Sequence, residues 1–176
     1  QESWQFTVLR AGIDNFADTA SDWLKRNFLT WQPTVKPVTY YTPEFLSYYA
    51  VEDCVAKCCA YIEENGSYVQ SDLVLGNLSH GKVWTMPMQY GVIAGKLGKM
   101  PNYYDVWIED AAGTRLTYIQ RYYASDIRSE EEQWVLFENS LGGIDTFRAY
   151  GDAENTAKHT HNVAEIENDS EEYRVD

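Results

Sequence analysis

The clearest alternation of apolar and polar residues lies between positions 103 and 123. Two stretches of period-two alternation, 103–110 and 114–123, flank the short turn Ala111-Ala112-Gly113. Side chains on a β-strand point alternately to opposite faces, so this pattern is typical of an antiparallel pair joined by a tight turn. The pattern predicts a β-hairpin over these residues.

The two faces of this hairpin carry different kinds of side chain. One face is expected to be core and consists of Tyr104, Val106, Ile108, Leu116 and Tyr118. The other is expected to be a contact surface and consists of Asp105, Trp107, Glu109 and Arg115.

Two more hairpins are predicted on either side of this one. Asn65-Gly66 separates the β-type runs 54–62 and 67–75, and Asn-Gly is typical of a type I′ turn because both central residues need positive φ. A second turn at 139–143 separates the runs 134–138 and 144–150. Single strands are expected at 3–9 and 82–89.

Other segments depart from the strand pattern. Apolar residues at helical spacing predict a short helix over 15–28, with Asp14 or Asn15 as its N-cap. Three prolines between positions 33 and 43 predict extended chain with edge strands. The segment 91–98 contains three glycines and is expected to be a loop.

Short strands without repeated strand–helix alternation indicate a mainly β fold. We expect an antiparallel β-sandwich of immunoglobulin-like or fibronectin-like type over residues 30–128, although the Cys…Trp…Cys spacing of antibody domains does not occur. Residues 1–29 are expected to add an N-terminal strand and the short helix. Residues 129–176 are expected to begin a second β unit with an acidic C-terminal segment.

The charge balance narrows the choice of partners. The chain has 14 basic and 27 acidic residues, a net charge of −13, and eight of the acidic residues lie in 152–176. Long-range repulsion by this charge excludes nucleic-acid binding as the main role. No run of 18 apolar residues occurs, so no membrane insertion is expected. The chain begins at Gln1 without an initiator Met, which indicates processing or a piece of a longer protein.

The cysteines and histidines predict no metal or cofactor. Cys54, Cys58 and Cys59 lie together without the second pair that a zinc site needs, so they are interpreted as buried, reduced side chains. Their clustering favours assembly in a reducing cytoplasm. His159 and His161 could share a strand face, but two ligands do not make a metal site, and solvated side chains are the simpler interpretation.

Two functions can be drawn from the carboxylates and aromatic residues. Asp105 and Glu109 flank Trp107 on one strand face, an arrangement that could bind a sugar ring, with Trp107 or Trp84 as the stacking platform. A hydrolase would need the two acids roughly 5–10 Å apart across a sugar, and no catalytic motif supports that chemistry.

Paired tyrosines give the stronger signal for an interface. The chain has 14 Tyr, and pairs occur at 40–41, 48–49, 103–104 and 122–123. On a strand, one member of each pair faces the core and the other faces outward. Tyr41, Tyr49, Trp107 and Tyr123 are therefore candidate exposed aromatic residues at a protein interface.

Three segments of the chain resemble parts of uncharacterised virion or prophage structural proteins from gut bacteria. They are Phe28-Leu29-Thr30-Trp31-Gln32-Pro33, Pro43-Glu44-Phe45-Leu46-Ser47-Tyr48-Tyr49 and the stretch 136–147, which contains Asn-Ser-Leu-Gly-Gly. The resemblance covers about half of the chain. It implies a modular, non-enzymatic protein of a phage tail or related assembly, located in a virion or on the bacterial surface, and it transfers no catalytic residues.

The sequence therefore predicts a non-catalytic structural or interaction module of a larger protein. Its partners would be other protein subunits or neighbouring domains. The alternative is a glycan-binding module of a bacterial surface protein. The candidate binding residues for either role are Trp107, Asp105, Glu109, Tyr123 and Trp84.

Overall fold

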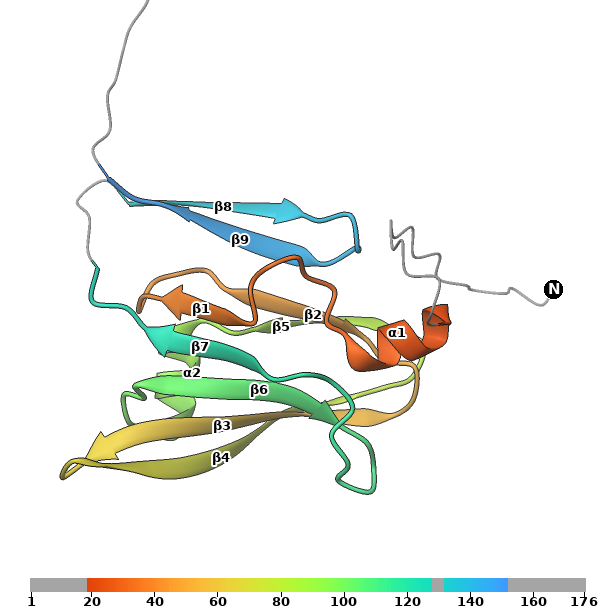
Figure 1. Ribbon diagram of the computed structural model, residues 1–176, viewed down its shortest axis with the longest axis horizontal. Coiled ribbons are helices and arrows are strands. Elements are labelled where there is room, and N and C mark those ends of the chain that lie inside the picture. Colours follow the sequence, from red (N-terminus) through yellow and green to blue (C-terminus); the bar gives the residue numbers. More distant parts are fainter. Residues whose placement is uncertain (1–18, 128–131, 152–176) are drawn as a thin grey trace, which may run out of the picture.

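The computed structural model describes residues 19–127 and 132–151, and in these ranges the fold is mainly β, as the alternation predicts (Figure 1). The helices are α1 (Ala20–Arg26) and α2 (Tyr90–Leu97). The strands are β1 (Val35–Val38), β2 (Phe45–Tyr49), β3 (Cys54–Glu64), β4 (Ser67–Leu78), β5 (Val83–Pro87), β6 (Tyr103–Glu109), β7 (Gln120–Ala124), β8 (Gln133–Glu138) and β9 (Ile144–Ala149). The predicted strand at 3–9 and most of the acidic C-terminal segment lie outside the described residues.

The largest sheet has five strands in the order β1-β7-β6-β3-β4. Four of these strands pair antiparallel with their neighbours, but β1 runs parallel to β7. The expectation of a purely antiparallel sheet was therefore wrong. Pro37 lacks a backbone N–H, so β1 suits the edge position that it occupies.

The predicted turns are confirmed. Asn65 and Gly66 both have positive φ, 52° and 77°, and they join β3 to β4. The turn at 139–143 joins β8 to β9 as a second antiparallel hairpin. The turn at 111–113 also forms, with the Asp110 N–H donating to the Thr114 carbonyl.

One core joins the five-stranded sheet to β2, β5 and α2. Figure 1 shows α2 behind β6 and β7, and the β2–β5 pair is a separate two-stranded sheet. The side chains at the centre of this core are almost fully removed from solvent, which is the main stabilising contribution to such a fold. They include Val38, Leu46, Tyr48, Ala56, Cys58, Met86, Ile93, Tyr104, Val106, Ile108 and Tyr122. The predicted core face of the 103–123 hairpin is thus confirmed, with Leu116 and Tyr118 partly buried beside it.

One of the two helices was not predicted, and the other has a different N-cap from the predicted one. The segment expected to be a Gly-rich loop is helix α2, which ends at Gly98 in the left-handed conformation that glycine favours. A Cβ atom on Gly91 would lie 3.2 Å from the Tyr40 ring, so glycine allows that ring to approach the helix closely. Helix α1 is confirmed within 15–28, but its N-cap is Thr19, whose hydroxyl accepts a hydrogen bond from the Asp22 N–H.

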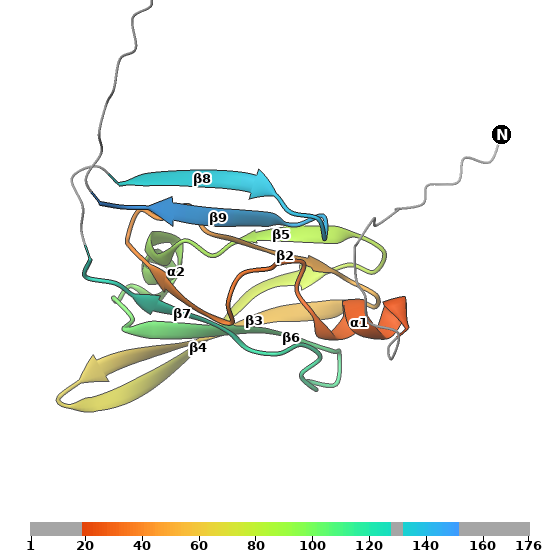
Figure 2. The same cartoon turned by 45° about the horizontal axis from the view of Figure 1, so that its top comes forward.

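The β8–β9 hairpin lies beside β2 (Figure 2). A Cβ atom on Gly143 would lie 1.9 Å from the Leu29 carbonyl oxygen, so only glycine permits this approach. Lys36 of β1 donates to the Glu44 carboxylate at 2.6 Å and to the Thr146 carbonyl of β9 at 2.8 Å. The predicted unit boundary after residue 128 stays a prediction. Neither described helix is long and apolar enough to cross a membrane.

Candidate interaction surface

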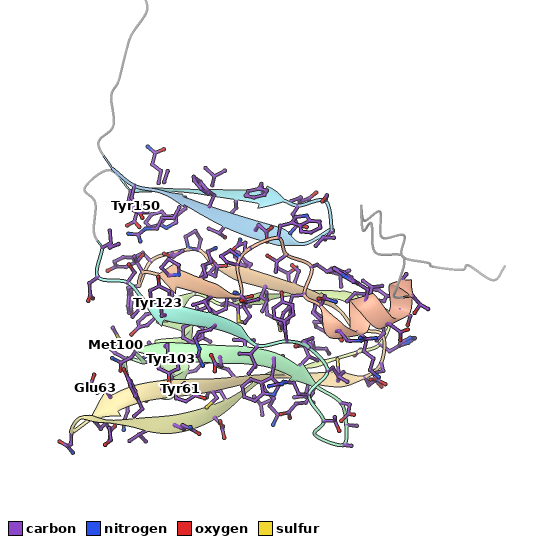
Figure 3. All side chains as sticks on the ribbon, viewed as in Figure 1. Tyr61, Glu63, Met100, Tyr103, Tyr123 and Tyr150 are labelled. Carbon is purple, nitrogen blue, oxygen red and sulfur yellow. The ribbon has the colours of Figure 1, made fainter. Side chains whose placement is uncertain are left out.

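Three tyrosines form a row across the outer face of the five-stranded sheet. Tyr61 of β3 is directly opposite Tyr103 of β6, and Tyr103 is directly opposite Tyr123 of β7. Figure 3 shows these three residues at the same end of the sheet. The Tyr61 and Tyr103 rings stack with centroids 4.3 Å apart, and Tyr68 of β4 meets Tyr103 edge-on at 5.5 Å. We call this surface, made of Tyr61, Tyr68, Tyr103, Tyr123 and Arg121, the tyrosine face.

Arg121 fixes the geometry of the tyrosine face. Its guanidinium carbon lies 4.6 Å from the centroid of the Tyr103 ring, a distance at which a cation is attracted to an aromatic face. Arg121 Nε and Nη2 donate to the two oxygens of Asp105 at 2.6 and 2.7 Å. Such a bidentate pair holds the planar guanidinium in one orientation. The charge-assisted bonds to Asp105 also raise the pKa of Arg121.

The remaining predicted residues of this face are partly covered. Trp107 is half-buried and its indole N–H donates to Glu109 Oε1 at 2.7 Å. Lys57 of β3 places its ammonium group 3.8 Å from the other Glu109 oxygen. The carboxylate and the indole therefore interact with each other rather than standing free for a ligand.

The structure brings some predicted site residues together and separates others. Asp105, Trp107, Glu109 and Tyr123 share the outer face of the five-stranded sheet, and Tyr123 is 41% exposed. Asp105 is only 3% exposed, and its predicted role as a surface contact stays a prediction. Trp84 belongs to β5 in the other sheet and packs against the core.

An interruption of the second strand explains why the pairing of Arg121 with Asp105 could not be predicted. Glu109 and Arg115 form an isolated bridge, so an unbroken hairpin would place Arg121 opposite Tyr103. In the structure Tyr123 takes that position and Arg121 is opposite Asp105. The two extra residues lie between Arg115 and the start of β7.

The prediction that one tyrosine of each pair faces the core and the other faces outward is confirmed for the pairs that lie on strands. Tyr48, Tyr104 and Tyr122 are buried, while their neighbours at 49, 103 and 123 are half-buried or exposed. Both members of the 40–41 pair are exposed because they lie at a turn rather than on a strand.

The cysteines are buried and unpaired, as expected. Burial raises the pKa of the Cys54 thiol to about 11, of Cys58 to about 12 and of Cys59 to about 11. Because the thiolate is the reactive form, the raised pKa values disfavour reaction of these thiols at neutral pH.

A second exposed aromatic surface lies between β1 and the β8–β9 hairpin. A cleft of about 350 Å³ is lined by Trp31, Phe137, Phe147 and Tyr150. Trp31 is 59% exposed, and its indole N–H is fixed by a 2.8 Å bond to Ser140 Oγ. We call this surface the hairpin cleft.

In the described ranges, no group of three or more potential metal ligands occurs, and His159 and His161 lie outside them. No protein-family model matches this chain, and no curated protein matches it. The resemblance to virion structural proteins therefore stays a prediction.

Proposed function

We propose that this chain is a non-catalytic interaction module that docks a protein partner on its tyrosine face. The observation that carries the proposal is the row of Tyr61, Tyr103 and Tyr123 on the side of the sheet that faces away from the core, where Arg121 lies over the Tyr61 and Tyr103 rings. The partner would be another protein subunit or a neighbouring domain of a larger protein.

The residue types on this face support protein docking. Tyr and Arg are enriched among the residues that dominate binding energy at interfaces. Tyr also supplies a large contact area while losing little conformational entropy. Stacking of Tyr61 on Tyr103 and the bidentate pair of Arg121 with Asp105 fix these side chains before any partner arrives, which lowers the cost of association.

We propose further that the fold is an immunoglobulin-like sandwich. The order β7-β6-β3-β4 corresponds to the G-F-C-C′ order of variable-type domains, and the β2–β5 pair corresponds to B and E. The edge strand β1 pairs parallel with β7, and helix α2 lies between β5 and β6. Domains of this kind are commonly modules of cell-surface proteins.

The proposed setting is a phage or prophage tail-type assembly, or a bacterial surface protein. The three resembling segments support this setting, and the net charge of −13 favours a partner surface that carries basic residues. Nucleic acid is not proposed as a partner for the same electrostatic reason.

Purification of the tagged chain from its native assembly tests the proposal. We expect a co-purifying subunit in fixed stoichiometry, and we expect its recovery to fall at least about tenfold in the Tyr103→Ala, Tyr123→Ala double variant. Tyr49→Ala, a half-buried tyrosine of the other sheet, is the matched control. A strictly monomeric chain, or a subunit that is retained equally by both variants, would contradict the proposal.

The second candidate function is glycan binding, and the hairpin cleft favours it over the predicted Trp107 site. Trp31 offers an exposed and fixed aromatic ring, whereas Trp107 is half-buried. Glycan arrays on the wild-type chain, Trp31→Ala and Trp107→Ala decide between the sites. Binding that is lost only in Trp31→Ala supports this candidate, and no binding by the wild-type chain removes it.

A further inference from the structure

A cavity of about 520 Å³ opens between the β1–β2 turn, helix α2 and the end of β7. Its size falls in the range of small-ligand sites. Three tyrosine rings and two carboxylates contribute to its wall: Tyr40, Tyr41, Tyr90, Asp126 and Glu132. Met100 lies at the rim, at the same end of the sheet as Tyr123 (Figure 3).

The Tyr40 ring stands at a steep angle to each of the other two rings that line the cavity. Tyr40 and Tyr41 meet edge-on, with ring centroids 5.1 Å apart and an interplanar angle of 73°. Tyr40 and Tyr90 are 6.1 Å apart and tilted by 59°.

The surrounding backbone holds two of these rings. The Tyr90 hydroxyl donates to the Pro101 carbonyl at 2.7 Å, which fixes the ring at the start of α2. Gly91 lets the Tyr40 ring approach the helix to within contact distance. Tyr41, in contrast, is 79% exposed at the mouth of the cavity. A large exposed aromatic side chain beside a hollow is available to a ligand.

Among the described residues that line the cavity, the charged ones are Asp126 and Glu132, and both are acidic. Asp126 lies exposed at the rim, and Glu132 contacts Arg148, which is not itself among the lining residues. No basic side chain lines the cavity in the described part of the chain. Aromatic faces and carboxylates both attract cations.

We propose that this cavity binds an organic cation of the alkylated ammonium class. The cation would lie against the faces of Tyr40 and Tyr41, with Asp126 supplying opposite charge at the mouth. The same chemistry is carried by a free small molecule such as choline and by a methylated lysine side chain of a protein. The inference does not depend on docking at the tyrosine face, because the two sites share no residue.

Titration by NMR with choline and with its neutral isostere, 3,3-dimethylbutan-1-ol, tests the charge requirement. We expect choline to shift the signals of Tyr40, Tyr41 and Tyr90, and the alcohol to bind at least about fivefold more weakly, because only the cation is attracted to the ring faces. Equal binding of the two compounds would overturn the proposal by showing a merely apolar cavity. No shift up to about 20 mM choline, weaker than the affinity of a useful site, would also overturn it.

Exposed residues permit matched variants that keep the fold. Tyr41→Leu should weaken choline binding by about threefold to tenfold, whereas Tyr41→Phe, which keeps the ring, should stay within about twofold of the wild-type chain. Asp126→Asn should weaken binding most at low ionic strength. Tyr123→Leu is the control, because it removes an exposed tyrosine outside the cavity. Equal loss in Tyr41→Leu and Tyr123→Leu would contradict the assignment.

A second titration, with peptides in place of choline, distinguishes the two sources of the cation. A trimethyllysine peptide that binds at least about fivefold more tightly than choline assigns the cavity to a modified protein partner, and comparable affinities assign it to a free small cation. Unmethylated lysine peptide serves as the reference in both cases.

Discussion

The two faces of strands β3, β6 and β7 use the same residue type for opposite purposes. On the inner face, Tyr104 and Tyr122 stack within the core, and the Tyr104 hydroxyl donates to the Met88 carbonyl at 2.5 Å. On the outer face, Arg121 lies 4.6 Å from the half-buried Tyr103 ring, and Tyr123 is 41% exposed. Each inner tyrosine is the sequence neighbour of an outer one.

The difference shows how a tyrosine is held when packing does not hold it. Inside, the ring is fixed by close neighbours and the hydroxyl by a backbone acceptor, so Tyr contributes to stability. Outside, a cation and a bidentate ion pair fix the ring position instead, which leaves aromatic surface for a partner. Variants on the two faces should therefore separate stability from binding.

The largest effect is expected from truncation on the inner face. Tyr104→Ala should lower the free energy of unfolding by about 3–5 kcal/mol, because it leaves a large cavity and removes the bond to Met88. Tyr103→Ala should lower it by no more than about 1 kcal/mol. Urea denaturation of both variants measures the contrast. Similar losses at the two positions would mean that the outer ring is part of the core.

Removal of Arg121 should have an intermediate effect. Arg121→Ala leaves the buried Asp105 carboxylate without its partner, and we expect a loss of about 1–3 kcal/mol, reduced by the partial exposure of the arginine. Asp105→Asn in the same background should recover part of this loss. A double-mutant cycle with zero coupling would show that the pair does not hold the tyrosine face.

The buried ion pair of Lys36 and Glu44 can be tested in the interior by the pH dependence of the free energy of unfolding. Burial raises the pKa of Glu44 from 4.5 to about 7, against the opposing effect of Lys36. A raised carboxyl pKa favours the folded state at low pH, and this contribution is lost as the pH rises from about 4.5 through about 7. Relative to Glu44→Gln, the wild-type chain should lose roughly 2–3 kcal/mol over that range. A pH-independent difference between the two chains would contradict this.

The smallest effect on stability is expected at the rim of the tyrosine face. Tyr123→Ala and Tyr68→Ala each remove an exposed ring and should change the free energy of unfolding by no more than about 0.5 kcal/mol. Thermal unfolding of the two variants measures this, and a loss above 1.5 kcal/mol in either would place the residue in a structural role.

Local patterns predicted the hairpins and the core face correctly because they depend on residues close in sequence. Asn65-Gly66 and the alternation of 104, 106 and 108 are such cases. The tyrosine face could be predicted only in part, since it depends on β3 pairing with β6 and on the interruption before β7. The cavity beside α2 could not be predicted, because it depends on the contact of Gly91 with Tyr40, which are far apart in sequence. The glycines of 91–98 predicted a loop there instead of the helix that lines the cavity.

Site-specific photo-crosslinking in the native assembly tests docking at the tyrosine face most directly. A benzophenone amino acid at position 123 lies on that face, and the same amino acid at exposed position 147 lies on the hairpin instead. We predict one discrete protein adduct from position 123 that disappears when Tyr61 and Tyr103 are changed to alanine. An adduct from position 147 with none from position 123 would contradict the account.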